Sequence, residues 1–119
     1  MQTGRMRISI VTPSLNQARF LEQCLQSVSA QRGGDFEHVV FDGGSTDGSV
    51  DILRRRGATL RWVSRRDGGQ ADAVNQGFLA TDGDIVGWLN SDDFYYPGAF
   101  AAVRAAFAAD ATLDAVYGQ

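Results

Sequence analysis

The sequence contains no lysine, and all eleven of its basic residues are arginine. This excludes a Walker P-loop, because that phosphate-binding loop needs a Gly-Lys pair followed by Ser or Thr. It also excludes a lysine nucleophile and a lysine Schiff base. A receiver-type phospho-acceptor domain is disfavoured as well, since such domains rely on a lysine near the phosphorylated aspartate.

Cysteine and histidine occur once each. The single cysteine, Cys24, excludes an internal disulfide, and its place on the apolar face of an expected helix predicts a small buried hydrophobe. The single histidine, His38, is expected to precede a strand. Because no Cys or His accompanies it at ligand spacing, a histidine-based metal site and a Ser-His-Asp triad are both disfavoured.

Long hydrophobic runs and basic runs are also missing. No apolar stretch approaches the ~20 residues of a membrane span, and no apolar segment follows residues 1–7 as a signal peptide would require. The net charge is −3, and the longest basic run is 54–56, so no nucleic-acid partner is expected. At 119 residues with 44% hydrophobic content, the chain should form one small domain or part of one.

Short β-rich runs alternate with helical patterns along the chain. The expected strands are 8–12, 37–41, 60–64, 84–90 and 113–117. The expected helices are 18–30, 47–56, 70–81 and 97–109, with Pro97 in the first turn of the last one. This order predicts an α/β fold, namely a Rossmann-like, mostly parallel sheet with helices on both faces. A sheet that stops at the fifth strand leaves an exposed edge, so the domain is expected to be truncated and could form a homo-oligomer through that edge.

Polar clusters follow four of the expected strands, at 12–16, 42–47, 65–70 and 90–93. In open parallel sheets, ligands bind outside the carboxyl ends of the strands. The four clusters should therefore converge on one edge of the sheet and form a single site.

The cluster Asn90-Ser91-Asp92-Asp93 directly follows an apolar run and holds two adjacent carboxylates. These carboxylates repel each other unless a cation lies between them, and their hard oxygen atoms suit Mg²⁺ or Mn²⁺ bridged to substrate phosphates. The alternative is a surface loop whose aspartates cap the next helix.

The first two clusters offer groups that suit a nucleobase. Asp42 lies just beyond the second strand and could accept a hydrogen bond from a base imide, although a simple turn aspartate is an equal alternative. The backbone after Thr12-Pro13-Ser14 could also face a base. Asn16 is expected to cap the first helix rather than bind a ligand, and Ser45, Thr46 or Asp47 is expected to cap the second.

The third cluster is 65–70, in the loop before the third helix. A helix N-terminus attracts anions, yet Asp67 is itself anionic, so it could orient an arginine or a sugar hydroxyl instead. Gln70 follows it in the same loop.

Taken together and in order, four segments resemble the inverting family 2 glycosyltransferases, which have a GT-A fold and use nucleotide-diphosphate sugars. The matching segments are 9–16, 40–48, 69–77 and 87–93, followed by Pro97-Gly98. The resemblance covers nearly the whole chain and depends on the order and spacing of the segments.

This resemblance implies a set of site residues. Asp42 would bind the base, usually uracil, and Asn90-Ser91-Asp92 would occupy the place of the family's DxD motif. Asp92 would be the main carboxylate that bridges Mn²⁺ or Mg²⁺ to the diphosphate, with Asp93 in support. The implied nucleotide-sugar site consists of Thr12, Pro13, Ser14, Asn16, Asp42, Gly43, Ser45, Asp67, Gln70, Asn90, Ser91 and Asp92.

Two departures from the family pattern stand out: Asn90 replaces the first aspartate of DxD, and Val74 lies where many relatives carry an arginine. The catalytic base and the acceptor-binding surface belong to the second half of the family's domain, so the base is expected beyond Gln119. Residues 1–119 would then be the nucleotide-diphosphosugar-binding part of the domain, inactive alone, with an unidentified glycan, lipid-linked or protein acceptor. The implied reaction is displacement at the anomeric carbon with inversion, in the cytoplasm or at the membrane periphery.

The alternative is a non-catalytic nucleotide-binding module or an inactive fragment that lacks the acceptor half. Metal-dependent nucleotide binding separates a working donor site from an inert fragment. A dinucleotide-binding Rossmann domain is disfavoured because no G-x-G-x-x-G follows the first strand.

Overall fold

The computed structural model describes residues 7–31, 35–57, 60–66, 79, 81 and 83–109. Its elements, in chain order, are β1 (Ile8–Ser14), α1 (Ala18–Ser29), β2 (Phe36–Asp42), α2 (Ser49–Arg55), β3 (Arg61–Ser64), β4 (Ile85–Trp88) and α4 (Ala99–Ala109). The helix expected at 70–81 lies outside the described residues except for 79 and 81, and the strand expected at 113–117 lies wholly outside them.

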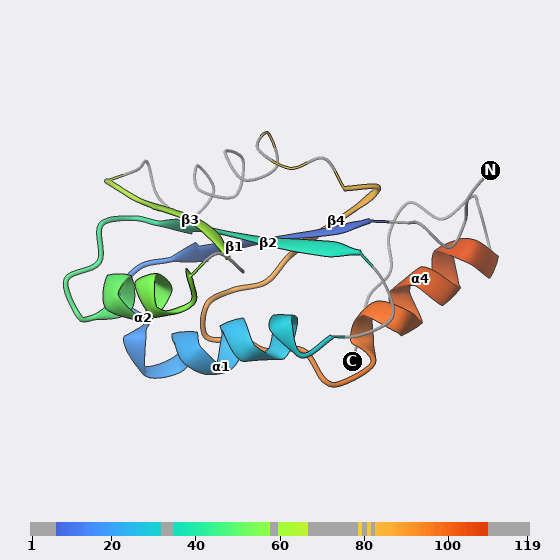
Figure 1. Ribbon diagram of the computed structural model, residues 1–119, viewed down its shortest axis with the longest axis horizontal. Coiled ribbons are helices and arrows are strands. Elements are labelled where there is room, and N and C mark those ends of the chain that lie inside the picture. The colour runs from blue at the N-terminus through green and yellow to red at the C-terminus, as the bar shows by residue number, and fades with distance from the viewer. Residues whose placement is uncertain are drawn as a thin grey trace.

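The strands form one parallel sheet in the order β3-β2-β1-β4 (Figure 1). The expected α/β, Rossmann-like architecture is confirmed. All seven residues of β1 are buried, as expected of a central parallel strand. The helices α1, α2 and α4 lie on the same face of the sheet.

The core lies between the sheet and these helices. Helix α1 buries Leu21, Cys24, Leu25 and Val28, whose spacing of three and four residues places them on one face. One cluster joins this face to β1 and α4, and a second joins it to β2 and α2. Cys24 is fully buried, which confirms the interpretation of the lone cysteine as a core residue.

Two local expectations are wrong. The expectation that His38 precedes a strand is wrong, whereas the expected strand 37–41, which includes His38, agrees with β2, a strand that begins at Phe36 opposite Ile8 of β1. Helix α4 begins at Ala99 rather than in the turn of Pro97. Gly98, just before the helix, has a left-handed backbone with φ 83°. Its carbonyl accepts a hydrogen bond from the Ala102 amide at 3.0 Å, so the helical bonding pattern starts at this residue.

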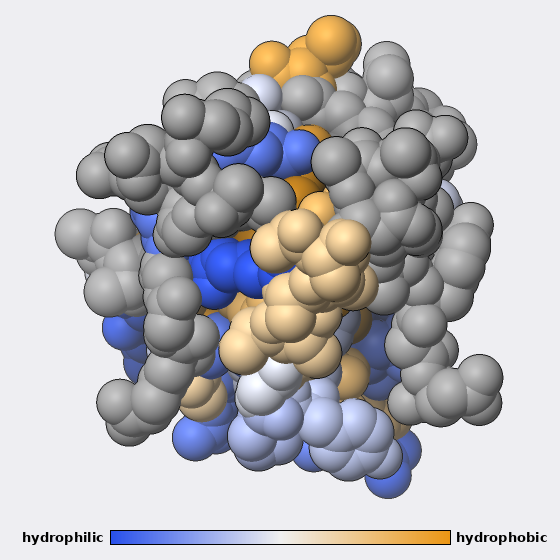
Figure 2. Space-filling model, turned by 90° about the vertical axis from the view of Figure 1, so that its right-hand side faces the viewer, coloured by the Kyte–Doolittle hydropathy of each residue, from blue (hydrophilic) through white to orange (hydrophobic). Residues whose placement is uncertain are grey.

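Helix α4 has an apolar outer surface. It faces the viewer in Figure 2, where its pale orange alanines occupy the middle of the molecule. Its buried residues are Phe100 and Arg104, and its exposed residues are all alanine. None of the helices in the described ranges is long and apolar enough to cross a membrane.

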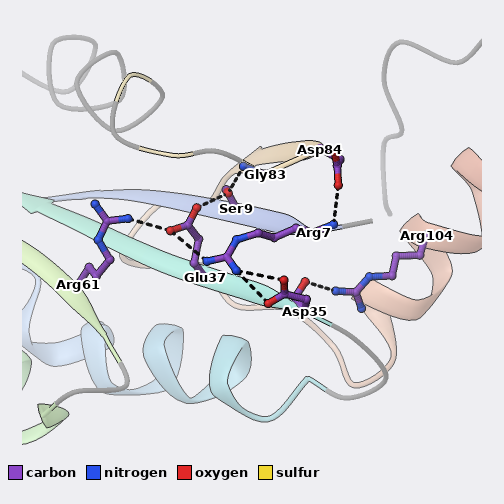
Figure 3. Close-up of polar contacts among 8 residues, drawn as sticks. All are labelled: Arg7, Ser9, Asp35, Glu37, Arg61, Gly83, Asp84 and Arg104. Carbon is purple, nitrogen blue, oxygen red and sulfur yellow. Dashed lines mark hydrogen bonds and ion pairs between the residues drawn. The ribbon is translucent and has the colours of Figure 1, made fainter. Parts of the chain in front are cut away.

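A polar network ties the elements together at the amino end of the sheet (Figure 3). At its centre, the buried Glu37 accepts a hydrogen bond from Ser9 Oγ at 2.6 Å and pairs with Arg61 at 2.8 Å and Arg7 at 3.5 Å. Arg7 also pairs with Asp35 at 3.0 Å. These contacts join β1, β2 and β3 on the side of the sheet opposite the carboxyl ends of the strands.

Gly83 fixes the start of β4 within the same network. Its amide donates to Ser9 Oγ at 2.9 Å. A Cβ at this position would lie 2.3 Å from that oxygen atom and 3.0 Å from the carbonyl of Arg7. Only glycine therefore permits this close approach of the two backbones.

Candidate functional site

The sheet register aligns the carboxyl ends of three strands. Ser14 of β1 is paired with Asp42 of β2, which is paired with Ser64 of β3. On the other side of β1, Trp88 ends β4 beside Val11. The polar clusters after β1, β2 and β4 therefore lie along one edge of the sheet, as predicted from the sequence.

Asp42 organises the loop after β2. Its carboxylate is 1% exposed. Oδ2 accepts hydrogen bonds from the amides of Gly44 (3.1 Å) and Ser45 (2.8 Å) and from Ser64 Oγ (2.8 Å), while Oδ1 accepts from Ser45 Oγ (2.5 Å). The structure thus gives Asp42 an internal role, and its contact with a nucleobase stays a prediction. Ser64 is absent from the expected site, and its only sequence signal is a hydroxyl residue at the end of a strand.

The loops after β1 and β2 are linked through Asn16, which has a left-handed backbone with φ 53°. Its amide donates to Ser45 Oγ at 2.8 Å, and its side-chain Oδ1 accepts from the Thr46 amide at 2.9 Å. The expectation that Asn16 caps the first helix is wrong, because Gln17 occupies the N-cap position without a side-chain bond. Asn16 instead holds two site loops together.

Asp47 supplies the hydrogen bonds at the start of both α1 and α2. Its Oδ2 accepts from the Ala18 amide at 2.9 Å, and its Oδ1 accepts from the Ser49 amide and hydroxyl at 3.1 and 2.7 Å. The hydroxyl of Ser49 and then the amide of Ala18 lower the pKa of this carboxyl below its usual value. Of the three residues expected to cap α2, Asp47 makes the contacts.

The end of β1 carries two different hydroxyls. Thr12 is fully buried, and its Oγ1 lies 2.7 Å from His38 Nε2 in the core. Ser14 is 5% exposed, and its Oγ has no hydrogen-bond partner among the residues that the structure describes. A buried hydroxyl without a partner is costly, which makes Ser14 Oγ a candidate contact for a ligand, and its role in the site stays a prediction. Pro13, between them, is also buried.

Residues 90–93, which we call the acidic turn, follow β4. The turn is closed by the Asp93 amide, which donates to the Asn90 carbonyl at 3.0 Å. The side chain of Asn90 is held by Trp88, whose indole Nε1 donates to Asn90 Oδ1 at 2.8 Å. Ser91 is buried, whereas Asp92 and Asp93 are exposed.

The acidic turn offers two carboxylate ligands that a hard cation could use. No group of three or more His, Cys, Asp or Glu side chains gathers within the described ranges. Two exposed neighbouring carboxylates nevertheless suit Mg²⁺ or Mn²⁺, since such ions use one or two carboxylates together with substrate phosphates and water. Burial raises the pKa of the Cys24 thiol to about 12; the Thr12 hydroxyl opposes this shift, and the charges of Asp93 and Asp92 add smaller raising effects.

Part of the expected site lies outside the described residues. Asp67 and Gln70 belong to the undescribed range 67–78, so the structure does not place them. Gly43 is the first residue after β2, and its amide donates to the carbonyl of Ser14, the last residue of β1, at 2.8 Å.

Comparison with known proteins identifies the family. The model of the family described as Glycosyl transferase family 2 matches residues 9–119. The chain belongs to this family.

The curated relatives are glycosyltransferases of bacteria. A PGL/p-HBAD biosynthesis glycosyltransferase of Mycobacterium bovis is 40% identical over 115 residues, which are 92% of this chain and 45% of the relative. An uncharacterized glycosyltransferase of Nostoc sp., alr2836, is 35% identical over 96 residues, which are 77% of this chain and 30% of the relative. The chain thus spans less than half the length of these curated relatives.

Solved structures show the same fold. The mannosyltransferase PcManGT from Pyrobaculum calidifontis, in complex with GDP-Man and Mn²⁺, is 27% identical with a TM-score of 0.74, covering 84% of this chain and 32% of that one. Glucosyl-3-phosphoglycerate synthase from Mycobacterium tuberculosis, with Mn²⁺, UDP and phosphoglyceric acid, is 31% identical with a TM-score of 0.65, covering 80% and 36%. TarS of S. aureus with UDP-GlcNAc, at 21% identity, a TM-score of 0.80 and coverage of 96% and 37%, supports the fold alone. The sheet therefore corresponds to the N-terminal part of GT-A structures.

Proposed function

We propose that this chain is the donor-binding part of a glycosyltransferase that moves a sugar from a nucleotide-diphosphate sugar to an acceptor hydroxyl with inversion. The observation that carries the proposal is the acidic turn. The chain belongs to family 2, and its acidic turn presents two exposed carboxylates at the carboxyl edge of the sheet. The strand before this turn pairs with β1, which pairs with β2, so the turn lies on the same edge as the loops after β1 and β2. We further propose a cytoplasmic location, because nucleotide sugars are supplied there.

In this proposal the acidic turn holds Mn²⁺ or Mg²⁺. Asp92 is the main metal carboxylate and Asp93 supports it. Asn90, fixed by the indole of Trp88, offers a neutral amide in place of a third carboxylate. The bound metal would offset the charge that builds on the departing diphosphate.

The nucleoside is proposed to bind over the ends of β1 and β2. The buried hydroxyl of Ser14, without a partner in the described structure, supports a polar contact there. The proposed nucleotide-sugar contacts are Thr12, Pro13, Ser14, Asn16, Asp42, Gly43, Ser45, Asp67, Gln70, Asn90, Ser91 and Asp92.

Uracil is the proposed base. Support comes from the similarity to the synthase solved with UDP and Mn²⁺. Guanine is the alternative, since the mannosyltransferase was solved with GDP-Man and Mn²⁺.

The general base and the acceptor site are assigned to residues outside 1–119. A carboxylate there would deprotonate the acceptor hydroxyl, which attacks the anomeric carbon from the face opposite the diphosphate. The part of the relatives that this chain does not cover, more than half of their length, leaves room for these functions.

A calorimetric titration tests the donor site. UDP should bind the chain in the presence of Mn²⁺, and Asp92→Ala should weaken this binding by about 10- to 100-fold, because a charge-assisted metal contact is lost. Asp51→Ala is the matched control, since Asp51 is an exposed carboxylate on α2 whose side chain contacts Arg54 at 3.4 Å.

UDP binding of equal strength without Mn²⁺, or unchanged in Asp92→Ala, would contradict the metal role. Binding of GDP instead of UDP would keep the donor site and change the base. A chain that binds donor and transfers no sugar is expected both of the donor-binding part proposed here, whose general base lies outside 1–119, and of the second candidate, a nucleotide-binding module without catalysis.

A further inference from the structure

A chain of polar groups runs through the core beneath the acidic turn. Thr12 and Cys24 are fully buried and His38 is 5% exposed. Thr12 Oγ1 lies 2.7 Å from His38 Nε2, and the nearby Thr12 hydroxyl lowers the pKa of the Cys24 thiol against the larger raising effect of burial. The thiol in turn donates to the carbonyl of Asn90, with Sγ 3.7 Å from the oxygen atom. The groups come from β2, β1 and α1 and end at the turn.

The donor and acceptor roles along this chain are compatible with one direction. A thiol carries one proton and a hydroxyl carries one. The thiol donates to the Asn90 carbonyl, so its sulfur atom is left to accept from the Thr12 hydroxyl, and Thr12 Oγ1 can then accept a proton from His38 Nε2. The imidazole in this arrangement is neutral, and burial followed by the charge of Arg56 lowers the pKa of His38 to about 3.

The Asn90 carbonyl is also the point where the acidic turn closes. It accepts the Asp93 amide at 3.0 Å as well as the Cys24 thiol. The side chain of the same residue is held by Trp88. The backbone and the side chain of Asn90 are therefore fixed from two separate directions.

Packing alone does not require polar side chains in this part of the core. Neighbouring positions on the same face of β1 and β2 are the apolar Ile10 and Val40, both buried. Buried polar groups are favourable only when their hydrogen bonds are satisfied, and a satisfied network fixes one arrangement.

We propose that His38, Thr12 and Cys24 act as positioning residues that fix the Asn90 carbonyl and so aim the carboxylates of Asp92 and Asp93 at the metal and the diphosphate. None of the three side chains touches a ligand, and the nucleotide-sugar contact proposed above for Thr12 is one of its backbone, because its side chain is fully buried. This inference rests on the proposed donor function of the acidic turn.

The first test needs no ligand. The chain has two tryptophans, so a nitrogen–proton correlation spectrum should contain two indole signals, and Trp62→Phe assigns the one from Trp88. Cys24→Ala and Thr12→Val should each shift the Trp88 signal, because Asn90 moves. Thr12→Ser, which keeps the hydroxyl, should leave it in place.

Val28→Ala is the matched packing control. Val28 is 1% exposed, lies one turn further along α1 and belongs to the same core cluster as Cys24. It should lower the free energy of unfolding without shifting the Trp88 signal. An unshifted Trp88 signal in both Cys24→Ala and Thr12→Val would overturn the proposal.

The second test measures donor affinity. Cys24→Ala and Thr12→Val should weaken Mn²⁺-dependent UDP binding by about 3- to 10-fold, as the loss of one buried hydrogen bond implies, while Val28→Ala keeps the affinity. Equal affinity loss in Val28→Ala and Cys24→Ala would overturn the positioning role. Wild-type chain that binds no nucleotide would count against the donor function, whereas the indole signal tests the positioning of the turn separately.

Discussion

The imidazole of His38 shows how burial changes the chemistry of one side chain. It is 5% exposed, and burial is the first cause that lowers its pKa to about 3. In the unfolded chain an ordinary histidine has a pKa of about 6.5. Between these two values the unfolded state binds the proton and the folded state does not.

This difference predicts a pH dependence of stability. His38 contributes stability that is present above about pH 6.5 and is lost as the pH falls toward 3, at up to about 1.4 kcal/mol per pH unit. Urea unfolding of the wild type and His38→Gln at pH 7, 5.5 and 4.5 would measure it. The free energy of unfolding should fall more steeply in the wild type, and parallel slopes would contradict the buried neutral state.

Single residues differ in how far the sequence predicts them. Cys24 was predictable because it repeats with Leu21, Leu25 and Val28 on one helical face. His38 was not, because its partner, Thr12, is set by the pairing of β1 with β2, 26 residues apart. The same holds for Asp42, whose bond to Ser64 joins residues separated by 22 positions.

At the scale of secondary-structure elements, Asp47 links two helices through one carboxylate. It serves the first turn of α1 through Ala18 and the first turn of α2 through Ser49. The two helices therefore share one source of capping, although 29 positions separate Ala18 from Asp47.

We predict that Asp47→Ala lowers the free energy of unfolding at pH 7 by about 1–2 kcal/mol, the usual effect of a lost N-cap. Because the folded pKa of Asp47 is lowered, its contribution is present above the unfolded value near 4 and is lost as the pH falls below it. The difference between wild type and variant should therefore shrink when urea unfolding is repeated near pH 3. Asp51→Ala, on the exposed side of α2, is the control and should have a smaller effect at pH 7.

The elements themselves were largely predictable from apolar runs and turn residues. β1 and β2 extend to Ser14 and Asp42, beyond the expected ends, because strand pairing continues through these polar residues. Helix α2 starts at Ser49 rather than at Asp47, since Gly48 adopts φ 101° before it. A positive φ at a glycine, as at Gly48, is difficult to predict from the sequence.

At the scale of the whole molecule, the two ends of the sheet are built differently. The amino end joins its charges in a network around Glu37 (Figure 3). The carboxyl end leaves the charges of Asp92 and Asp93 exposed. The convergence of polar loops on the carboxyl end follows from parallel topology and was predictable, whereas the amino-end network depends on strand register and was not.

Because the thiol of Cys24 is buried between α1 and the sheet, its rate of chemical labelling measures how often the core opens. A thiol-reactive disulfide reagent can modify this fully buried sulfur only in molecules where α1 has separated from the sheet. For a stability of about 5 kcal/mol, labelling in buffer should be slower than in urea by up to about a thousandfold or slightly more, the limit being reached if α1 separates only on global unfolding. Labelling at the urea rate would show that α1 does not stay closed on the sheet. Because the chain has no other cysteine, the labelling rate measures how often the interface between α1 and the sheet opens, and no probe has to be introduced.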